Sequence, residues 1–193
     1  MNRTDILSVT GMALILALIT PVPAVRAAAP AAHGGSPFIS VTLDPDGESA
    51  LIRASIDIPG GPAPIWRAMT DCDANLRMIR SMVGCRVMQK GAGWDIREHV
   101  TRGGPLLPSF RYLVRSDYEP LRRIRFRKID GNLKTLEGEW GLTALDGGRA
   151  TRVTYENRVA ARILAPPFVV RAGLRRDTPR VLENLRRLVT GEG

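Results

Sequence analysis

The chain has 193 residues, of which 44% are apolar, 24% are charged and only 5% are aromatic. This length suits one domain with one hydrophobic core. The net charge of +9 is compatible with nucleic acid or an anionic lipid surface as a partner. A basic surface that is simply solvated is the simpler explanation of this charge. Because the arginines are spread along predicted strands and the last helix, and no nucleic-acid-binding motif is present, we expect no nucleic acid partner.

The first residues have the pattern of a secretory signal peptide. Arg3 supplies a thin positive end, and it is followed by the apolar run Ile6–Val22 and by small-x-small cleavage sites around Ala27. The run is too short, and too soon followed by prolines, for a comfortable membrane span. We therefore expect a cleaved signal peptide at residues 1–27 and a periplasmic or secreted protein. An uncleaved signal that tethers the chain to a membrane is the alternative.

Residues 28–48 are rich in Ala, Pro and Gly, which predicts a flexible lead-in with at most one short extended piece at Phe38–Leu43. From Ala50 to Ile58 apolar and polar residues alternate, which predicts a half-buried strand. Two short helices are expected next, the first opened by Pro64 and the second at Ala74–Ile79.

Six further strands are predicted from the same alternation and from the glycine-containing turns between them. They are expected at Cys85–Gly91, Gly93–Arg102, Phe110–Glu119, Leu121–Ile129, Lys134–Leu145 and Ala150–Ala161. Successive hairpin turns make an antiparallel sheet, and strands with one apolar and one charged face make a sheet that is covered on one side only.

The last long segment, Ala165–Val189, predicts an amphipathic helix. Its apolar residues recur at spacings of three, four and seven, and arginines fill the opposite face. Such a helix must lay its apolar face on the sheet. The fold class is therefore α+β. We expect a curved antiparallel sheet of about seven strands, two short helices and a long C-terminal helix across the concave side, with space between sheet and helix.

Cys72 and Cys85 are the only cysteines. In an oxidising compartment this pair suggests a disulfide that contributes about 3 kcal/mol, and two buried free thiols are the equal alternative. With only two histidines, of which His33 lies in the lead-in, we expect no metal site.

Several segments resemble the SRPBCC or START-like helix-grip superfamily, which includes START domains, polyketide cyclase/dehydrase-like proteins and coenzyme Q-binding proteins. The resemblance rests on the first strand with Pro64–Trp66, and on Thr70-Asp71, Cys85–Val87, Leu136–Trp140, Thr151–Tyr155 and Leu174–Asp177. It implies a START-like domain at residues 49–190. Together with the expected signal peptide and the cysteine pair, this describes an exported bacterial member of the superfamily. It also implies a cavity that holds a quinone, a lipid or another apolar molecule, with no further cofactor.

The candidate cavity residues are those that alternation places on the inner face of the sheet or of the last helix. They are Ile56, Trp66, Ile96, Glu98, Tyr112, Val114, Phe126, Gly138, Trp140, Tyr155, Asn157, Val170 and Leu174. We expect Glu98 to pair with an arginine, and His99, on the other face of its strand, to be solvated.

The sequence shows no catalytic set, which favours a binding protein over an enzyme. Our first hypothesis is a monomer that binds or transfers a quinone, an isoprenoid or another lipid in the cavity between the sheet and the C-terminal helix. The second is a cyclase or dehydratase for a polyketide-like substrate, which needs Glu98, Tyr112, Tyr155 or Asn157 to converge. The third is a module that uses its arginines to bind an acidic protein or an anionic membrane surface. Its affinity would fall as the salt concentration rises.

Overall fold

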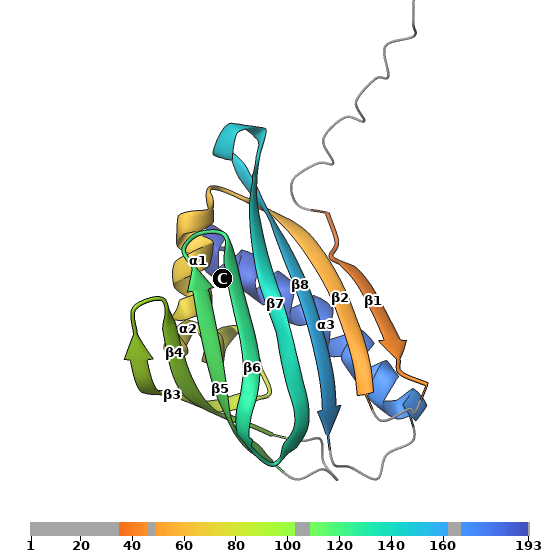
Figure 1. Ribbon diagram of the computed structural model, residues 1–193. Helices are drawn as coiled ribbons and strands as arrows, with labels where there is room; N and C mark the ends of the chain where they lie inside the picture. Colours follow the sequence, from red (N-terminus) through yellow and green to blue (C-terminus); the bar gives the residue numbers. More distant parts are fainter. Residues whose placement is uncertain (1–34, 46–48, 103–108, 162–166, 193) are drawn as a thin grey trace, which may run out of the picture. The chain divides into compact units, whose positions relative to one another are not determined.

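The computed structural model describes residues 35–45, 49–102, 109–161 and 167–192. Its main feature is one antiparallel sheet of eight strands in the order β1-β2-β8-β7-β6-β5-β4-β3 (Figure 1). The strands are β1 (Phe38–Leu43), β2 (Ser49–Pro59), β3 (Met82–Gly91), β4 (Trp94–Thr101), β5 (Phe110–Glu119), β6 (Arg123–Gly131), β7 (Leu133–Leu145) and β8 (Ala150–Ala161). The helices are α1 (Pro62–Thr70), α2 (Cys72–Met78) and α3 (Pro167–Thr190). The α+β helix-grip architecture predicted from the sequence is confirmed.

Within the lead-in expected at residues 28–48, the short extended piece anticipated at Phe38–Leu43 forms the edge strand β1, which brings the sheet to eight strands. This segment pairs along its whole length with β2, and Val41 lies opposite Ile52. Val41 is buried with Ala50 and Ile52 in a small apolar cluster, which explains why the short segment joins the sheet. The expected signal peptide at residues 1–27 lies outside the described residues.

Both short helices begin at residues that stabilise a helix N-terminus. Prolines occupy the first turn of α1, where their missing N–H groups have no helical partner to lose. Asp71 caps α2, because its side-chain oxygen accepts a hydrogen bond from the Ala74 N–H at 2.8 Å. The two helices therefore follow each other with a single residue between them.

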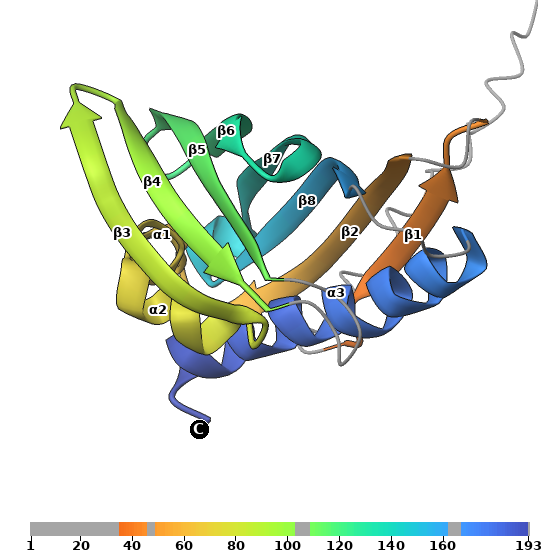
Figure 2. The same cartoon turned by 90° about the horizontal axis from the view of Figure 1, so that it is seen from below.

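The long helix α3 covers only part of the inner face of the sheet (Figure 2). It contacts β1 and β2, and it also contacts α1 and α2. Leu182 and Leu185 have no exposed surface and join Ile56, Ile58 and Val153 in the main core. This half of the molecule is closely filled.

The outer face of the sheet carries charges, as alternation predicts. Arg53 pairs with Glu156 at 2.7 Å, and Arg152 pairs with Asp57 at 2.7 Å. These pairs join neighbouring strands across a solvated surface.

Within the described ranges, none of the helices combines the length and the apolar character that crossing a membrane requires.

Candidate functional site

The other half of the inner face, beside α1 and α2, contains a cavity of about 130 Å³. Strands β3 to β8 form its floor, and α1, α2 and the residue after α2 form one side wall. Its lining residues are Met69, Asn75, Met78, Ile79, Met82, Arg97, His99, Tyr112, Val114, Ser116, Tyr118, Ile124, Phe126, Leu136, Trp140 and Tyr155.

No described side chain of α3 lines this cavity, which corrects the expected position between sheet and C-terminal helix. The reason lies in the packing of α3. Leu182 and Leu185 are fully buried against the core and leave no space beneath that part of the helix. The short helices α1 and α2 instead cover the half of the sheet that α3 does not reach.

Aromatic rings form one apolar wall of the cavity. The ring centroids of Trp140 and Tyr155 are 4.1 Å apart, and those of Phe126 and Tyr155 are 6.2 Å apart with nearly parallel planes. Met69, Met78 and Met82 contribute flexible thioether side chains on the side of the short helices. Such side chains adapt to irregular shapes, so this wall can adjust to a bound ring.

The inner face of β4 is polar, which the sequence did not predict. Asp95 and Arg97 are only 5% and 6% exposed, and His99 lines the cavity. Ile96 and Glu98, which were expected inside, therefore lie on the opposite face. Glu98 there forms ion pairs with Arg111 at 2.9 Å and with Arg86 at 3.4 Å, as part of the prediction anticipated. Alternation predicts apolar residues on the inner face, whereas on β4 paired charges occupy it.

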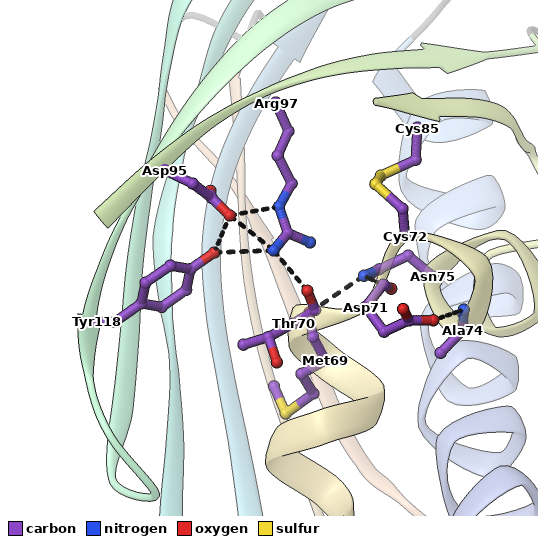
Figure 3. The surroundings of a disulfide bond; sticks show 10 residues. All are labelled: Met69, Thr70, Asp71, Cys72, Ala74, Asn75, Cys85, Asp95, Arg97 and Tyr118. Carbon is purple, nitrogen blue, oxygen red and sulfur yellow. Dashed lines mark hydrogen bonds and ion pairs between the residues drawn. A yellow bond between two sulfur atoms is a disulfide. The ribbon is translucent and has the colours of Figure 1, made fainter. Parts of the chain in front are cut away.

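Arg97 holds the polar end of the cavity together (Figure 3). Its Nε donates to Asp95 Oδ2 at 2.7 Å, and its Nη2 donates to Thr70 O at 2.6 Å and to the Tyr118 hydroxyl at 3.1 Å. The Tyr118 hydroxyl in turn donates to Asp95 Oδ2 at 2.7 Å. Burial and the hydrogen bond to Asp95 raise the pKa of Tyr118, so it stays protonated. A buried ion pair is stable only with such additional hydrogen bonds.

His99 is largely withdrawn from solvent and lines the cavity, which corrects the expectation of a solvated residue. Burial, helped by the positive charge of Arg97 and opposed by Asp95, lowers its pKa to about 4. The imidazole is therefore neutral at neutral pH, and its Nε2 is buried without a hydrogen-bond partner. Its ring meets Tyr112 edge to face at a centroid distance of 5.6 Å. Burial also raises the pKa of Tyr112 to about 12, against a smaller opposing effect of Thr101.

Residues 58–186 match the family described as polyketide cyclase / dehydrase and lipid transport. The chain belongs to this family. A comparison with curated protein sequences finds no match.

Solved structures of other proteins have the same fold as this member of the polyketide cyclase / dehydrase and lipid transport family. The lipid transfer and protein localization domain of human StarD13 has a TM-score of 0.68 at 12% identity, over 82% of this chain and 87% of that chain. A Thermus thermophilus protein has a TM-score of 0.62 at 19% identity, over 74% and 99%. The Zhui aromatase/cyclase from a Streptomyces species has a TM-score of 0.59 at 15% identity, over 75% and 93%.

Only some of the candidate cavity residues line the observed cavity. The cavity lining contains Tyr112, Val114, Phe126, Trp140 and Tyr155. Their strands follow the simple rule of apolar or aromatic residues inside and arginines outside, so alternation placed them correctly on the inner face.

The remaining candidates lie elsewhere. Ile56 belongs to the filled core, and Leu174 packs on the cluster of Val41, Ala50 and Ile52. Trp66 meets Tyr118 edge to face at 5.8 Å, outside the cavity lining. The side chain of Val170 lies outside the described residues.

Gly138 and Asn157 lie opposite each other on β7 and β8. A Cβ at Gly138 would clash with Glu156 O, so this position needs a glycine for the close approach of the strands. Asn157 is 4% exposed, and its Oδ1 has no partner. Neither residue lines the cavity.

Sequence reasoning missed several lining residues. Ser116 and Tyr118 continue the alternation of Tyr112 and Val114 along β5, so extending that pattern by two steps would have found them. No comparable signal marks Met69 and Met78, because a methionine suits a short helix whichever of its faces packs on the sheet. The position of α1 and α2 over the sheet depends on tertiary contacts.

Cys72 and Cys85 form a disulfide between α2 and β3, with their Cα atoms 5.4 Å apart (Figure 3). It lies close to the hydrogen bonds of Arg97, because Thr70, whose carbonyl oxygen accepts from Arg97, is only two residues before Cys72. Within the described parts of the chain, no group of three or more His, Cys, Asp or Glu side chains is arranged to hold a metal ion.

Proposed function

We propose that this protein binds an apolar small molecule whose ring carries an oxygen atom, with a quinone or a related isoprenoid lipid as the ligand class. One observation supports this most directly: a single cavity combines an aromatic wall of Phe126, Trp140 and Tyr155 with a polar end at Arg97. Pockets for small molecules typically pair a mainly apolar lining with a few placed polar groups.

The size of the cavity favours a ring over a lipid tail. A volume of about 130 Å³ is similar to the roughly 150 Å³ of an engineered apolar cavity that accepts benzene. The ring of the ligand would therefore occupy the cavity as it stands, and accommodation of more atoms would require the methionine wall to move.

The polar end favours a ligand with a hydrogen-bond acceptor. Arg97 uses Nε and Nη2 to bind Asp95, Thr70 and Tyr118, and its Nη1 has no hydrogen-bond partner among the described residues. A guanidinium N–H donates and cannot accept, so a carbonyl oxygen is the matching group. The lipid transfer domain of human StarD13 has the same fold, which is consistent with a lipid-like ligand.

Extraction of the purified protein followed by mass spectrometry tests this proposal first. A titration with ubiquinone carrying one isoprene unit, followed by quenching of the intrinsic tryptophan fluorescence, to which Trp140 in the cavity wall contributes, tests it directly. Val114→Phe fills the cavity and is expected to abolish the response. The matched control is Leu113→Phe, which adds the same ring to the other face of β5 and should leave binding intact. An empty extract together with no quinone response in the native protein would exclude the ligand class.

A cyclase or dehydratase is the second candidate, and His99 is the observation that favours it. A neutral imidazole that lines a cavity beside Tyr112 can accept a proton from a substrate carbon or hydroxyl. Of the four residues that this activity would use, Tyr112 and Tyr155 line the cavity, whereas Glu98 faces outward and Asn157 lies outside the lining. Incubation with a poly-β-ketone thioester, with loss of water followed by mass spectrometry, tests it. His99→Phe should then stop turnover and preserve binding.

Export and an anionic membrane partner also remain proposals. The Cys72–Cys85 disulfide supports an oxidising compartment. Phe168 is 72% exposed at the start of α3 and is followed by the exposed Arg171, which supports contact with anionic lipid headgroups. Sedimentation with phosphatidylglycerol vesicles at low and high salt tests the second point.

A further inference from the structure

The short helix α2 is fixed to the rest of the domain at three points. The Cys72–Cys85 disulfide ties its first residue to β3. Just before it, Thr70 O accepts a hydrogen bond from Arg97 of β4 at 2.6 Å. At its other end, Met78 O accepts one from Asn184 Nδ2 of α3 at 2.9 Å. Only the first of these links is covalent.

The segment held in this way is a wall of the cavity. Met69, Asn75, Met78 and Ile79 are the lining residues that do not come from strands. Asn75 Nδ2 also donates to Met69 O at 3.1 Å and to Asp71 O at 2.6 Å, so the junction of α1 and α2 is bonded internally (Figure 3). A change at Cys72 will therefore displace this junction as a unit and not a single side chain.

The disulfide is accessible from outside the cavity. Cys72 and Cys85 are both partly exposed, and β3 is the edge strand of the sheet, with Arg86 and Val87 beside Cys85 exposed to solvent. Access is one of the conditions for thiol–disulfide exchange. The other two links of α2 are hydrogen bonds that involve buried groups, and no reductant alters them.

We propose that the Cys72–Cys85 disulfide is a redox-sensitive latch that controls ligand exchange with the cavity beside α2. This inference rests on the proposed function, since it takes that cavity to be the ligand site. In the oxidised state the latch holds α2 against β3, and in the reduced state α2 moves away from the sheet more often and ligand exchange becomes faster.

The chemistry of the latch is an ordinary exchange with a dithiol. A thiolate of the dithiol attacks one of the two sulfur atoms, the Cys72–Cys85 bond breaks, and a mixed disulfide forms. The second thiolate of the dithiol then displaces the bound cysteine. The dithiol loses two electrons and becomes a disulfide, while Cys72 and Cys85 gain these electrons and each takes up a proton.

Two measurements on the full chain test the latch, one with a ligand and one without. The first is the dissociation rate of ubiquinone with one isoprene unit, measured by stopped-flow fluorescence of the oxidised and the dithiothreitol-reduced protein. The second is hydrogen exchange of the backbone amides, which needs no ligand. The variant Cys72→Ser with Cys85→Ser cannot form the disulfide and mimics the reduced state, and Ile52→Val is a destabilised control that keeps the disulfide and lies outside the cavity.

Reduction is expected to raise the dissociation rate on the order of tenfold and to lower amide protection at residues 74–79 by a similar factor, with β2 and β8 unchanged. The double serine variant should behave like the reduced protein and ignore dithiothreitol, and Ile52→Val should keep the slow dissociation of the oxidised protein.

The latch is overturned if α2 stays protected after reduction, or if β2 and β8 lose protection to the same extent as α2. In the second case the disulfide stabilises the whole domain and has no local role. If ubiquinone fails to bind the oxidised protein, the ligand class is wrong, and the hydrogen-exchange comparison still decides whether the disulfide controls α2.

Discussion

The two halves of the inner sheet face are built differently. Beneath α3, strands β2 and β8 present Ile56, Ile58 and Val153, which are 0–3% exposed and packed against Leu182 and Leu185. Beside α1 and α2, strands β4 and β5 present Arg97, His99 and Ser116 around a cavity of about 130 Å³. The filled half provides stability, and the hollow half keeps polar groups available to a ligand.

This difference shows that the fold accepts a cavity and buried polar groups in the half beside α1 and α2. Voids and buried polar atoms both reduce stability unless something compensates for them. In the hollow half the compensation comes from the bonds among Arg97, Asp95, Tyr118 and Thr70. Even so, Asp95 Oδ1 and His99 Nε2 stay without partners. Asn157 Oδ1 on β8 also has no partner, but it does not line the cavity, whereas Asp95 and His99 lie where polar groups and empty space occur together.

The largest expected effect comes from breaking the buried charge cluster. Arg97→Met leaves Asp95, whose side chain is 7% exposed, as an uncompensated buried charge. We expect the free energy of unfolding to fall by about 3–5 kcal/mol in urea denaturation. The double variant Arg97→Met with Asp95→Asn removes both charges and should lose clearly less. Equal losses in the two variants would show that the charge pair is not what holds this half together.

A cavity made in the filled half comes next. Leu185→Ala removes a fully buried side chain and should cost about 4 kcal/mol, whereas Met82→Ala, which only enlarges an existing cavity, should cost about 2 kcal/mol. Both values come from urea denaturation at neutral pH. If Met82→Ala cost as much as Leu185→Ala, the hollow half would be packed as tightly as the filled half.

The stability of the hollow half should also depend on pH through His99. The pKa of this residue is about 4 in the folded chain and near 6.5 in the unfolded chain, so between these values only the unfolded chain takes up the proton. Stability should therefore fall as the pH drops from 6.5 to 4, by about 3 kcal/mol from this group. Arg97, Asp95 and Tyr112 are the neighbours that face it.

His99→Gln cannot titrate and provides the comparison. The difference in the free energy of unfolding between the native protein and this variant should change with pH in that window and be constant above pH 7. A constant difference down to pH 4 would mean that the imidazole is not buried in solution.

The smallest effect is expected on the outer face. Arg53 and Glu156 form an ion pair with side chains that are 58% and 50% exposed. Arg53→Ala should change the free energy of unfolding by at most about 1 kcal/mol, and salt should reduce the difference further. A larger loss would show that the charged outer face supports the sheet as much as the core does.

Much of this protein follows from its sequence alone. Strict alternation in β2, β5, β6, β7 and β8 identified the strands and their inner faces, because a strand that is buried on one side must separate apolar from charged residues. For the same reason the apolar stripe at Leu182 and Leu185 identified the helix that covers the sheet. These features depend only on local periodicity.

Only the tertiary structure decided the site. On β4 the inner residues are Asp95, Arg97 and His99, and the burial of Asp95 and Arg97 depends on Tyr118 and Thr70, which are distant in the sequence. The position of α2, and with it the methionine wall, is fixed by Cys85 and Asn184. Periodicity reports which residues avoid water on their own, whereas a buried charge becomes acceptable only when partners from other elements reach it, and no local pattern carries that information.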